Sequence, residues 1–303
     1  MSYTTKQFQI LTDIGLVWRL LTDVYTPLWD NGPATPFFEY ALNSSWMNKT
    51  YLPMIRLWLD GDVPVALAFY EEPVNQPRFA LRPGHEALAG EMIAYAESAF
   101  PDFGAPRELV LYSGQRALID AAEVRGYRLA DEETTLLFDF SKGKLDHPLP
   151  AGYHFVDGRD ADPLKAAKCL WDGFNRAERG PFVDWDKPTN DAWSPHTLYQ
   201  SVLGSTLSPP PHATYERDVI IADENGDYVC FSGMWWVPEN HLAYMEPLCT
   251  VPEHQRRGLA AAALSQHDRN LRPLGAQIMT GGGNEFYRKI GYTEALRSLR
   301  YVK

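Results

Sequence analysis

The chain has 303 residues, of which 45% are hydrophobic, 22% charged and 13% aromatic, and its formal net charge is −11. This composition predicts a globular protein long enough for two domains, and the acidity argues against nucleic acid and anionic membranes as partners. No apolar run reaches the ~18–20 residues of a spanning helix, the first residues lack a signal-peptide pattern, and three cysteines are too few for a disulfide framework, so we expect a reduced, cytoplasmic protein.

The first half of the sequence predicts a mixture of helices and short strands from its hydrophobic spacing and its turn residues. The expected elements are, in order, a helix over 14–26, strands over 52–60 and 63–70 joined by the turn Gly61-Asp62, a helix over 86–100, a strand over 108–112, a helix over 115–124 and a strand over 134–140.

The second half predicts a similar order with longer elements. These are a strand over 153–156, helices over 162–175 and 195–203, strands over 217–222, 228–237 and 241–251, a helix over 258–271, a strand over 277–280, a helix over 285–290 and a strand over 294–302.

A polar stretch rich in proline and glycine, residues 141–152, lies near the midpoint of the chain. We place a domain boundary in it and expect domains over residues 1–145 and 146–303. The order of elements predicts the α+β class, with mostly antiparallel sheets flanked by helices. A dinucleotide-binding fold would need regular strand–helix alternation and a G-x-G-x-x-G turn, and neither is found.

The most informative segment, residues 246–260, leads from a predicted strand into a predicted helix. A helix start carries about four backbone N–H groups without partners, and the helix dipole favours an anion there. Gly258 lets the main chain approach a phosphate closely, and Ala260 adds no bulk. Arg256 and Arg257 add positive charge. The segment predicts a pyrophosphate site; the alternative is an ordinary helix start with an exposed basic pair.

Gln255-Arg256-Arg257-Gly258-Leu259-Ala260 matches the Q/R-x-x-G-x-G/A pyrophosphate motif of the GNAT acyltransferase superfamily. Further along, residues 284–292 resemble that family's element of an asparagine, a tyrosine and a glycine–aromatic pair, here Asn284, Tyr287 and Gly291-Tyr292. The order and type of elements agree over residues 151–303. The resemblance implies a catalytic GNAT domain with a splayed, mixed sheet.

The resemblance also implies acetyl-CoA as co-substrate and a primary amine of a small molecule as acceptor. Main-chain groups of the strand would pair with the pantetheine arm, amides at the helix start would hold the pyrophosphate, and an N–H near Leu248 or Cys249 would stabilise the oxyanion of the reaction. The residues implied in binding acetyl-CoA are Leu248, Cys249, Thr250, Val251, Arg256, Arg257, Gly258, Leu259, Ala260, Asn284 and Tyr287.

Acetyl transfer to an amine needs a base before the attack and an acid for the departing thiolate. Glu246 is the expected base, directly or through water, with Glu239 and His241 as fallbacks. In an unbroken strand Glu246 would face away from Met245, so it would be a structural carboxylate unless a bulge near Pro247 redirects it. Tyr287 stands where many family members place the acid; the alternative is an aromatic residue packed on the sheet.

Other reactive groups have simpler interpretations. We expect Cys249 to be a small buried strand residue rather than a nucleophile, because no histidine is placed to activate it. The eight histidines form no H-x-x-x-H pair, so no metal is expected. The glycines at 281–283 are expected to permit a tight turn, rather than to form a phosphate loop, with Asn284 as the helix cap.

Aromatic residues gather before the cofactor motif, and the resemblance implies that some of them line an acceptor pocket. We expect core packing for Trp171, Phe174 and one of the paired tryptophans. The loop 177–194 is long enough to act as a substrate lid. The residues concerned are Trp171, Phe174, Phe182, Trp185, Trp193, Trp235 and Trp236.

The first half resembles the end of the GNAT fold over residues 118–127, but lacks the pyrophosphate motif. The corresponding segment, 81–88, contains Pro83, which has no N–H to donate, and Glu86, which places a negative charge at the helix start. We therefore expect a degenerate domain that binds no acetyl-CoA and supports or borders the acceptor site.

The leading expectation is thus a tandem GNAT N-acetyltransferase acting on a small amine. A non-catalytic acetyl-CoA-binding or interaction protein is the first alternative. Acetylation of protein lysines or N-termini is the second, and would need an open groove for a peptide. The oligomeric state is not determined by these patterns, and a homodimer is compatible with them.

Overall fold

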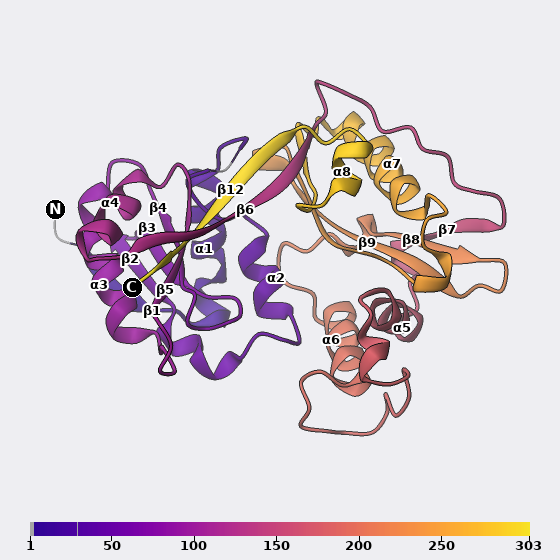
Figure 1. The fold of residues 1–303 in the computed structure, drawn as a ribbon, viewed down its shortest axis with the longest axis horizontal. Helices are drawn as coiled ribbons and strands as arrows, with labels where there is room; N and C mark the ends of the chain where they lie inside the picture. Colours follow the sequence, from indigo (N-terminus) through magenta and orange to yellow (C-terminus); the bar gives the residue numbers. More distant parts are fainter. Residues whose placement is uncertain (1–2, 29) are drawn as a thin grey trace. The chain divides into compact units, whose positions relative to one another are not determined.

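The computed structural model describes residues 3–28 and 30–303 (Figure 1). Contacts divide the chain into two compact units. Unit 1 comprises Met1–Leu42, Met47–Thr135 and Glu294–Lys303, and unit 2 comprises Asn43–Trp46 and Leu136–Thr293. The last strand of the sequence therefore belongs to the unit formed mainly by its first half.

Unit 1 consists of a sheet packed against helices. Its strands are β1 (Thr4–Gln7), β2 (Arg56–Asp60), β3 (Val63–Phe69), β4 (Arg78–Leu81), β5 (Glu108–Tyr112), the first part of β6 (Arg128–Asp139) and β12 (Glu294–Val302). Its helices are α1 (Ile10–Val24), α2 (Phe37–Asn43, whose last residue is counted in unit 2), α3 (Ala89–Ala99) and α4 (Arg116–Val124), with short 3-10 helices at Lys49–Met54 and Glu86–Leu88.

The strand order in unit 1 is β1-β2-β3-β4-β5-β12-β6. From β1 to β12, neighbouring strands are antiparallel except β4 and β5, which are parallel and pair at Arg78 and Val110. Helix α1 packs on the sheet through Val17, Leu20, Leu21 and Val24, which are buried and spaced to lie on one helical face.

Unit 2 has its own strands and a core of its own. Its strands are the end of β6, β7 (Tyr153–Asp157), β8 (Val219–Asp223), β9 (Tyr228–Val237), β10 (Leu242–Thr250) and β11 (Ile278–Thr280). Its helices are α5 (Pro163–Gly173), α6 (Pro195–Leu207), α7 (Leu259–Leu271) and α8 (Glu285–Lys289), with 3-10 helices at Gly158–Asp160, Arg176–Arg179, Tyr215–Arg217, Pro238–Asn240, Pro252–His254 and Arg272–Leu274.

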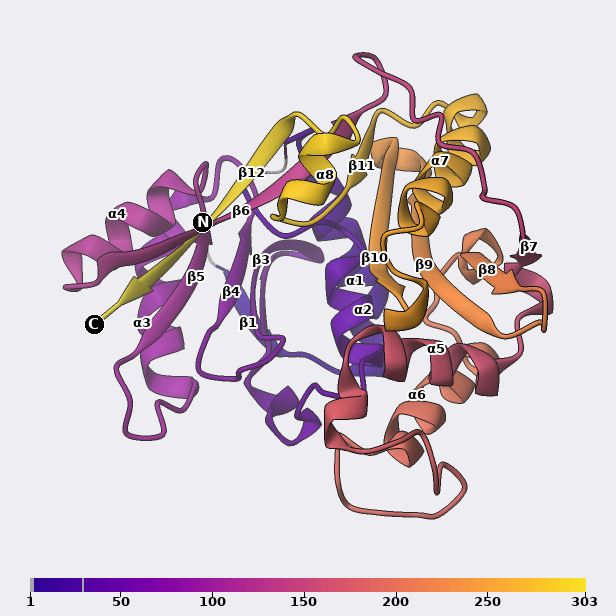
Figure 2. The same ribbon diagram turned by 45° about the vertical axis from the view of Figure 1, so that its right-hand side comes forward.

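The strand order in unit 2 is β6-β11-β10-β9-β8-β7, and β10 and β11 are its parallel pair. Helices α7 and α5 lie on opposite sides of β9 (Figures 1 and 2). Leu259, Ala262 and Ala263 of α7 pack on one face with Val219 and Ile221. Asp162, the residue before helix α5, accepts hydrogen bonds from the amides of Leu164 and Lys165 and so caps the helix.

The two units repeat one order of elements and exchange its last member. Strands β2, β3 and β4, helix α3, strand β5, helix α4 and strand β6 correspond to β8, β9, β10, α7, β11, α8 and β12. Strand β6 pairs with β11 of unit 2, where Phe138 lies beside Met279, and β12 pairs with β5 of unit 1, where Leu299 lies beside Leu111. The last strand of each repeat thus pairs with β11 or β5 of the other repeat.

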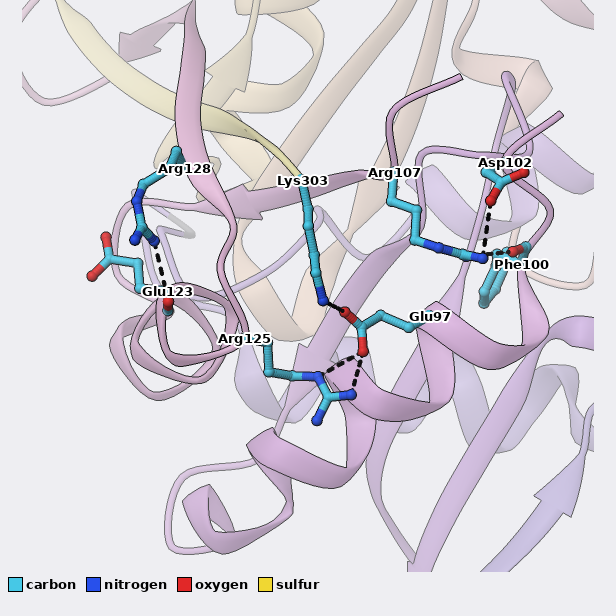
Figure 3. A network of polar contacts seen from close by, with 8 residues as sticks. All are labelled: Glu97, Phe100, Asp102, Arg107, Glu123, Arg125, Arg128 and Lys303. Atoms are coloured by element: carbon cyan, nitrogen blue, oxygen red, sulfur yellow. Dashed lines mark hydrogen bonds and ion pairs between the residues drawn. The ribbon is translucent and has the colours of Figure 1, made fainter. Parts of the chain in front are cut away.

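Polar contacts hold the end of β12 in unit 1 (Figure 3). The main chain of Lys303 donates to Arg107 O at 2.9 Å and accepts from Arg107 N at 3.1 Å. Lys303 Nζ donates to Glu97 Oε1 at 2.6 Å, and Arg125 Nε donates to Glu97 Oε2 at 2.7 Å. Burial raises the pKa of Glu97, but hydrogen bonds from Arg125 and Lys303 outweigh it and leave that pKa below its usual value.

Most expected elements are present, and those at 108–112, 228–237 and 294–302 have the expected bounds. Three elements were not expected, namely β1, α2 and β4. Strand β1 is largely exposed and shows no apolar alternation, and β4 has only four residues. The expected strand over 52–60 begins only at Arg56, because a 3-10 helix occupies Lys49–Met54.

Candidate active site

The candidate site of unit 2 lies where the parallel strands β10 and β11 separate. They pair by main chain at Leu242 with Ile278 and at Ala243 with Met279. At Met245 a side chain takes over: Thr280 Oγ1 accepts from Met245 N at 2.6 Å and donates to Met245 O at 3.1 Å. Beyond Met245, β10 continues to Thr250 along β9 while β11 ends, so the sheet is splayed.

A β-bulge interrupts β10 at this point. Met245 pairs with Met234 and Leu248 with Ser232, so Glu246 and Pro247 together oppose the single residue Gly233. A Cβ at residue 233 would collide with the carbonyl of Glu246 and lie 2.9 Å from Pro247 Cδ, so only glycine fits beneath the bulge. The bulge considered near Pro247 is confirmed, and the simple alternation that would have turned Glu246 away from the site does not apply.

Glu246 and Tyr287 act on each other electrostatically. Burial raises the pKa of Tyr287, and the negative charge of Glu246 raises it further. Tyr287 is 7% exposed. Tyr287 of α8 and Glu246 of β10 are therefore near enough for their charges to interact, and the phenol keeps its proton at neutral pH. Their roles as acid and base stay predictions.

The Tyr287 ring is seated between two glycines and two aromatic rings. A Cβ at Gly281 would lie 2.7 Å from Tyr287 Cδ1, and one at Gly282 would lie 2.8 Å from Tyr287 Cε2. Phe286 and Tyr292 each contact the ring with centroids 5.1 Å apart. These two glycines supply space for the ring rather than left-handed backbone. Asn284 Oδ1 accepts from Phe286 N at 3.1 Å, so its expected role as helix cap is confirmed.

The main chain of β10 offers amides at the open edge of the splay. Val251 N donates to Val229 O of the β9 side at 2.9 Å. Since successive residues of a strand point their main-chain groups to alternate sides, Cys249 also faces β9, whereas Leu248 and Thr250 face away from it. Thr250 O accepts from Gln255 Nε2 at 3.1 Å. The geometry favours Leu248 N–H over Cys249 N–H as the donor near a thioester.

The start of α7 has the features of an anion site. Arg256 has φ 61° and Gly258 has φ 85° and ψ 5°, so the main chain turns through left-handed conformations before the helix. No side chain caps the helix and its first turn holds no acidic residue. Among the described residues, the amides of Arg256 to Ala260 donate no main-chain hydrogen bond. A Cβ built on Gly258 meets no atom within 4 Å. These residues fit a diphosphate.

The two arginines of the motif differ in their surroundings. Arg257 donates to Tyr153 OH at 3.0 Å and to Glu253 O at 2.9 Å, and Tyr153 OH also bonds His254 Nδ1 at 2.9 Å. This network ties the loop before α7 to β7. Arg256 is exposed beside the helix start. The positive charges of both arginines favour an anion at the start of α7, and the main-chain amides there supply the hydrogen-bond donors.

Other expected residues lie as follows. Cys249 is 5% exposed, and its Sγ lies 3.8 Å from Cys169 O of α5, so it is the buried strand residue that was expected. Glu239 lies in the 3-10 helix Pro238–Asn240 and His241 directly before β10, so both precede the strand that carries Glu246. Their place as fallback bases stays a prediction. Phe174 is 44% exposed, so its expected place in the core is wrong; Trp171 is buried, as expected.

The loop between α5 and α6 is anchored by aromatic residues. Trp171 Nε1 donates to Gly180 O at 3.0 Å, and His196 Nδ1 lies 2.9 Å from Trp185 O. The guanidinium groups of Arg176 and Arg179 lie 5.1 and 5.4 Å from the Trp193 ring. Gly173, the last residue before this loop, packs closely on Cys249: a Cβ at residue 173 would lie 2.6 Å from Cys249 Sγ. The loop thus starts beside the strand that would carry the pantetheine.

The corresponding places in unit 1 are filled by its own side chains. At the start of α3, Glu86 Oε1 accepts from Gly84 N at 2.8 Å, and hydrogen bonds from the amides of Gly84 and Glu86 lower the pKa of Glu86. Between β4 and β5, Gln115 Nε2 donates to Phe79 O at 2.7 Å and to Asn31 O at 3.1 Å, and Gln115 Oε1 accepts from Tyr112 N at 3.0 Å.

Sequence reasoning missed Gly233, Thr280 and Gln115. Glycine inside the strand pattern 228–237 was an available signal for a bulge or a close approach of backbone. Nothing in the sequence distinguished Thr280 or Gln115 from other polar residues at an element boundary. Within residues 3–28 and 30–303, no group of three or more His, Cys, Asp or Glu is arranged to hold a metal. No helix in the described chain has the length and apolar character to cross a membrane.

Comparisons with known proteins agree with this geometry. No family model matches the sequence, and no curated protein matches it. Among solved structures, a GCN5-related N-acetyltransferase from Sphaerobacter thermophilus has a TM-score of 0.56 at 14% identity, covering 99% of this chain and 95% of that one. A tandem GNAT protein from the clavulanic acid biosynthesis pathway, in a structure without acetyl-CoA, has a TM-score of 0.55 at 11% identity, covering 100% and 98%. The chain therefore has the GNAT fold, as expected, in a tandem arrangement of the α+β class.

Proposed function

We propose that this protein is an acetyl-CoA-dependent N-acetyltransferase that transfers the acetyl group to a primary amine of a small molecule. One observation carries the proposal: unit 2 combines a bulged strand, a carboxylate at Glu246 that acts electrostatically on Tyr287, and a helix start that has no side-chain cap and whose amides donate no main-chain hydrogen bond. The GNAT fold supports acetyl transfer in general.

Acetyl-CoA supplies an activated thioester when it is bound. In the proposal its diphosphate lies on the amides of Arg256, Arg257, Gly258, Leu259 and Ala260. Its pantetheine arm lies along Leu248, Cys249, Thr250 and Val251, with the amide of Thr250 as a donor to the arm and Asn284 beside it. The absence of a side-chain cap and of acidic residues at the helix start supports this placement.

The chemical step needs three protein groups. Glu246 takes a proton from the amine, directly or through water, so that the nitrogen lone pair attacks the thioester carbon. Leu248 N–H donates to the oxygen that becomes negative as the C–N bond forms. Tyr287 gives its proton to the sulfur as the C–S bond breaks, and the second proton that the nitrogen loses as the amide forms restores the tyrosine. The pKa of Tyr287 is raised above its usual value, so the phenol holds a proton at neutral pH.

We further propose that residues 1–145 and 146–303 are two copies of one domain, of which the first binds no acetyl-CoA. Glu86 supplies its own carboxylate at the helix start of that copy, and Gln115 bridges its parallel strands. An incoming diphosphate would meet a like charge there. A cytoplasmic location stays part of the proposal, supported by the three free cysteines.

Calorimetry with acetyl-CoA, followed by thiol release with a panel of amines, tests the proposal. Binding with turnover of small amines is the expected result. Tight binding without turnover would favour a non-catalytic acetyl-CoA-binding protein. Turnover of peptides alone would favour protein acetylation. No binding at millimolar acetyl-CoA would contradict the proposal.

A further inference from the structure

Thr280 makes an unusual contact at the point where β10 and β11 part. It is the last residue of β11 and is 3% exposed. Main-chain pairing of the two strands has ended at Ala243 and Met279, yet both main-chain groups of Met245 are satisfied, because the Thr280 hydroxyl accepts from one and donates to the other at 2.6 and 3.1 Å. The Thr280 side chain thus takes the place of main-chain hydrogen bonds between β10 and β11 at Met245.

The position of this contact decides which part of β10 is open. Met245 directly precedes the bulge, and Pro247 has no N–H. The next amide that faces away from β9 is therefore that of Leu248. The hydroxyl of Thr280 bonds both main-chain groups of Met245. Leu248 N–H is then the next amide on this edge of β10 that is available to a ligand.

Unit 1 shows a different treatment of the same gap. There Gln115 donates to Phe79 O of β4 and accepts from Tyr112 N of β5, so one amide joins both strands. The side chain is longer, and it also bonds Asn31 O. In unit 2 the short side chain of Thr280 bonds only Met245 across the two strands. It holds β10 and β11 together at that residue and makes no contact between them further along.

We propose that Thr280 is a positioning residue that fixes where β10 and β11 separate, and thereby places the thioester carbonyl at Leu248 N–H. The inference rests on the proposed acetyl transfer. Loss of the hydroxyl leaves a buried donor and a buried acceptor without partners, so the strands must shift or admit water. Either change displaces Leu248 and the bulge relative to Tyr287.

The test compares Thr280→Val, which keeps the shape and loses the hydroxyl, with Thr280→Ser, which keeps the hydroxyl. We expect Thr280→Val to lower kcat about 10- to 100-fold, because a displacement of about 1 Å is enough for such a loss. KM for acetyl-CoA should change less than about 3-fold, since the diphosphate contacts remain. Thr280→Ser should keep kcat within about 3-fold of the unmodified protein. The Met245 amide should exchange hydrogen slowly in the unmodified and Ser proteins and faster in Val.

Each outcome discriminates. An active unmodified protein whose Val variant is equally active overturns the positioning role and leaves the proposed function standing. A Ser variant as impaired as Val also overturns it, because then the methyl group and not the hydroxyl matters. If Val does not fold, slow exchange at Met245 with an active Ser variant supports the role, and rapid exchange in the unmodified protein overturns it. Failure of the unmodified protein to bind acetyl-CoA overturns both proposals.

Discussion

At the scale of residues, the candidate site depends on close approaches that only small side chains allow. Gly233 fits beneath the Glu246–Pro247 bulge, and Gly281 and Gly282 lie against the ring of Tyr287. The glycines therefore determine where the two reactive side chains lie. Tyr287 and Glu246 can be tested one at a time. Phenylalanine and glutamine have nearly the same shape as these side chains and lack the hydroxyl and the carboxylate, respectively.

Replacement of Tyr287 by Phe removes the hydroxyl and keeps the ring contacts to Phe286 and Tyr292. We expect kcat to fall about 100-fold, a typical effect of losing a general acid. KM for acetyl-CoA should stay nearly constant. Since the pKa of Tyr287 is raised above its usual value, the unmodified protein should show no loss of kcat from tyrosine ionisation up to about pH 10. Steady-state kinetics over pH measure both; an unchanged kcat in the variant would remove the acid role.

Replacement of Glu246 by Gln removes the expected base and keeps the shape of the side chain. In the unmodified protein, kcat/KM should rise with pH as the carboxyl loses its proton. The variant should lose this acidic limb and be about 100-fold slower. Glu239→Gln is the matched control, because Glu239 precedes the first residue of β10, at the end of the strand away from the bulge. Its replacement should leave the pH profile unchanged. If kcat/KM of Glu246→Gln still rises with pH, the group that titrates is another residue.

At the scale of elements, the two copies place the same turn before different helix starts. Gly258 precedes α7 with φ 85°, and Gly84 precedes the 3-10 turn of α3 with φ 90°. A Cβ on either glycine meets no atom within 4 Å. Only the second copy leaves its amides available, because Glu86 bonds Gly84 N in the first.

These glycines give a matched pair of substitutions. Gly258→Val and Gly84→Val should each lower the free energy of unfolding by about 1–2 kcal/mol, because both force a β-branched residue into the left-handed region. Only Gly258→Val should also weaken acetyl-CoA binding, by about 10-fold or more, through bulk beside the diphosphate. Calorimetry and urea unfolding measure the two effects. Equal loss of binding in both variants would contradict the assignment of the diphosphate to α7.

At the scale of the whole molecule, the exchange of β6 and β12 makes the pairing within each unit depend on a strand from elsewhere in the sequence. Strand β12 follows α8, which carries Tyr287, and ends at Val302; the next residue, Lys303, pairs with Arg107 in unit 1. The Glu97 cluster secures that end with hydrogen bonds from Lys303 and Arg125 (Figure 3). The stability of unit 1 should therefore respond to charge at Glu97.

We expect Glu97→Gln to lower the free energy of unfolding by about 1 kcal/mol at pH 7, a small value because both cationic partners are partly exposed and screened by solvent. The folded-state pKa of Glu97 is below its unfolded value of about 4.3, so its stabilisation is present above that pH and is lost as the pH falls through the folded-state pKa. The gap between variant and unmodified protein should close in urea unfolding near pH 3. Asp120→Asn, at an exposed pair, is the control and should have no measurable effect. A gap that persists at low pH would contradict the ionic origin.

Glu246 and Tyr287 were chosen through the family resemblance, and their roles stay predictions. The sequence by itself determined most of the element order of both halves, the helix start at 258–260 and the cap at Asn284. These are local features: hydrophobic period, glycine placement and side chains that cap their own helix leave a signal within a few residues. The short strand β4 and the exposed strand β1 left too little of that signal.

Only the tertiary structure decided the rest. The bulge that places Glu246 depends on Gly233 of the neighbouring strand, and the splay depends on Thr280, 35 residues from Met245 along the chain. The exchange of β6 and β12 is invisible in a linear pattern, because a strand's hydrophobic alternation fixes which face is buried and not which edge it will join. Pairing partners are chosen by contacts between distant segments, and a single sequence does not record those contacts.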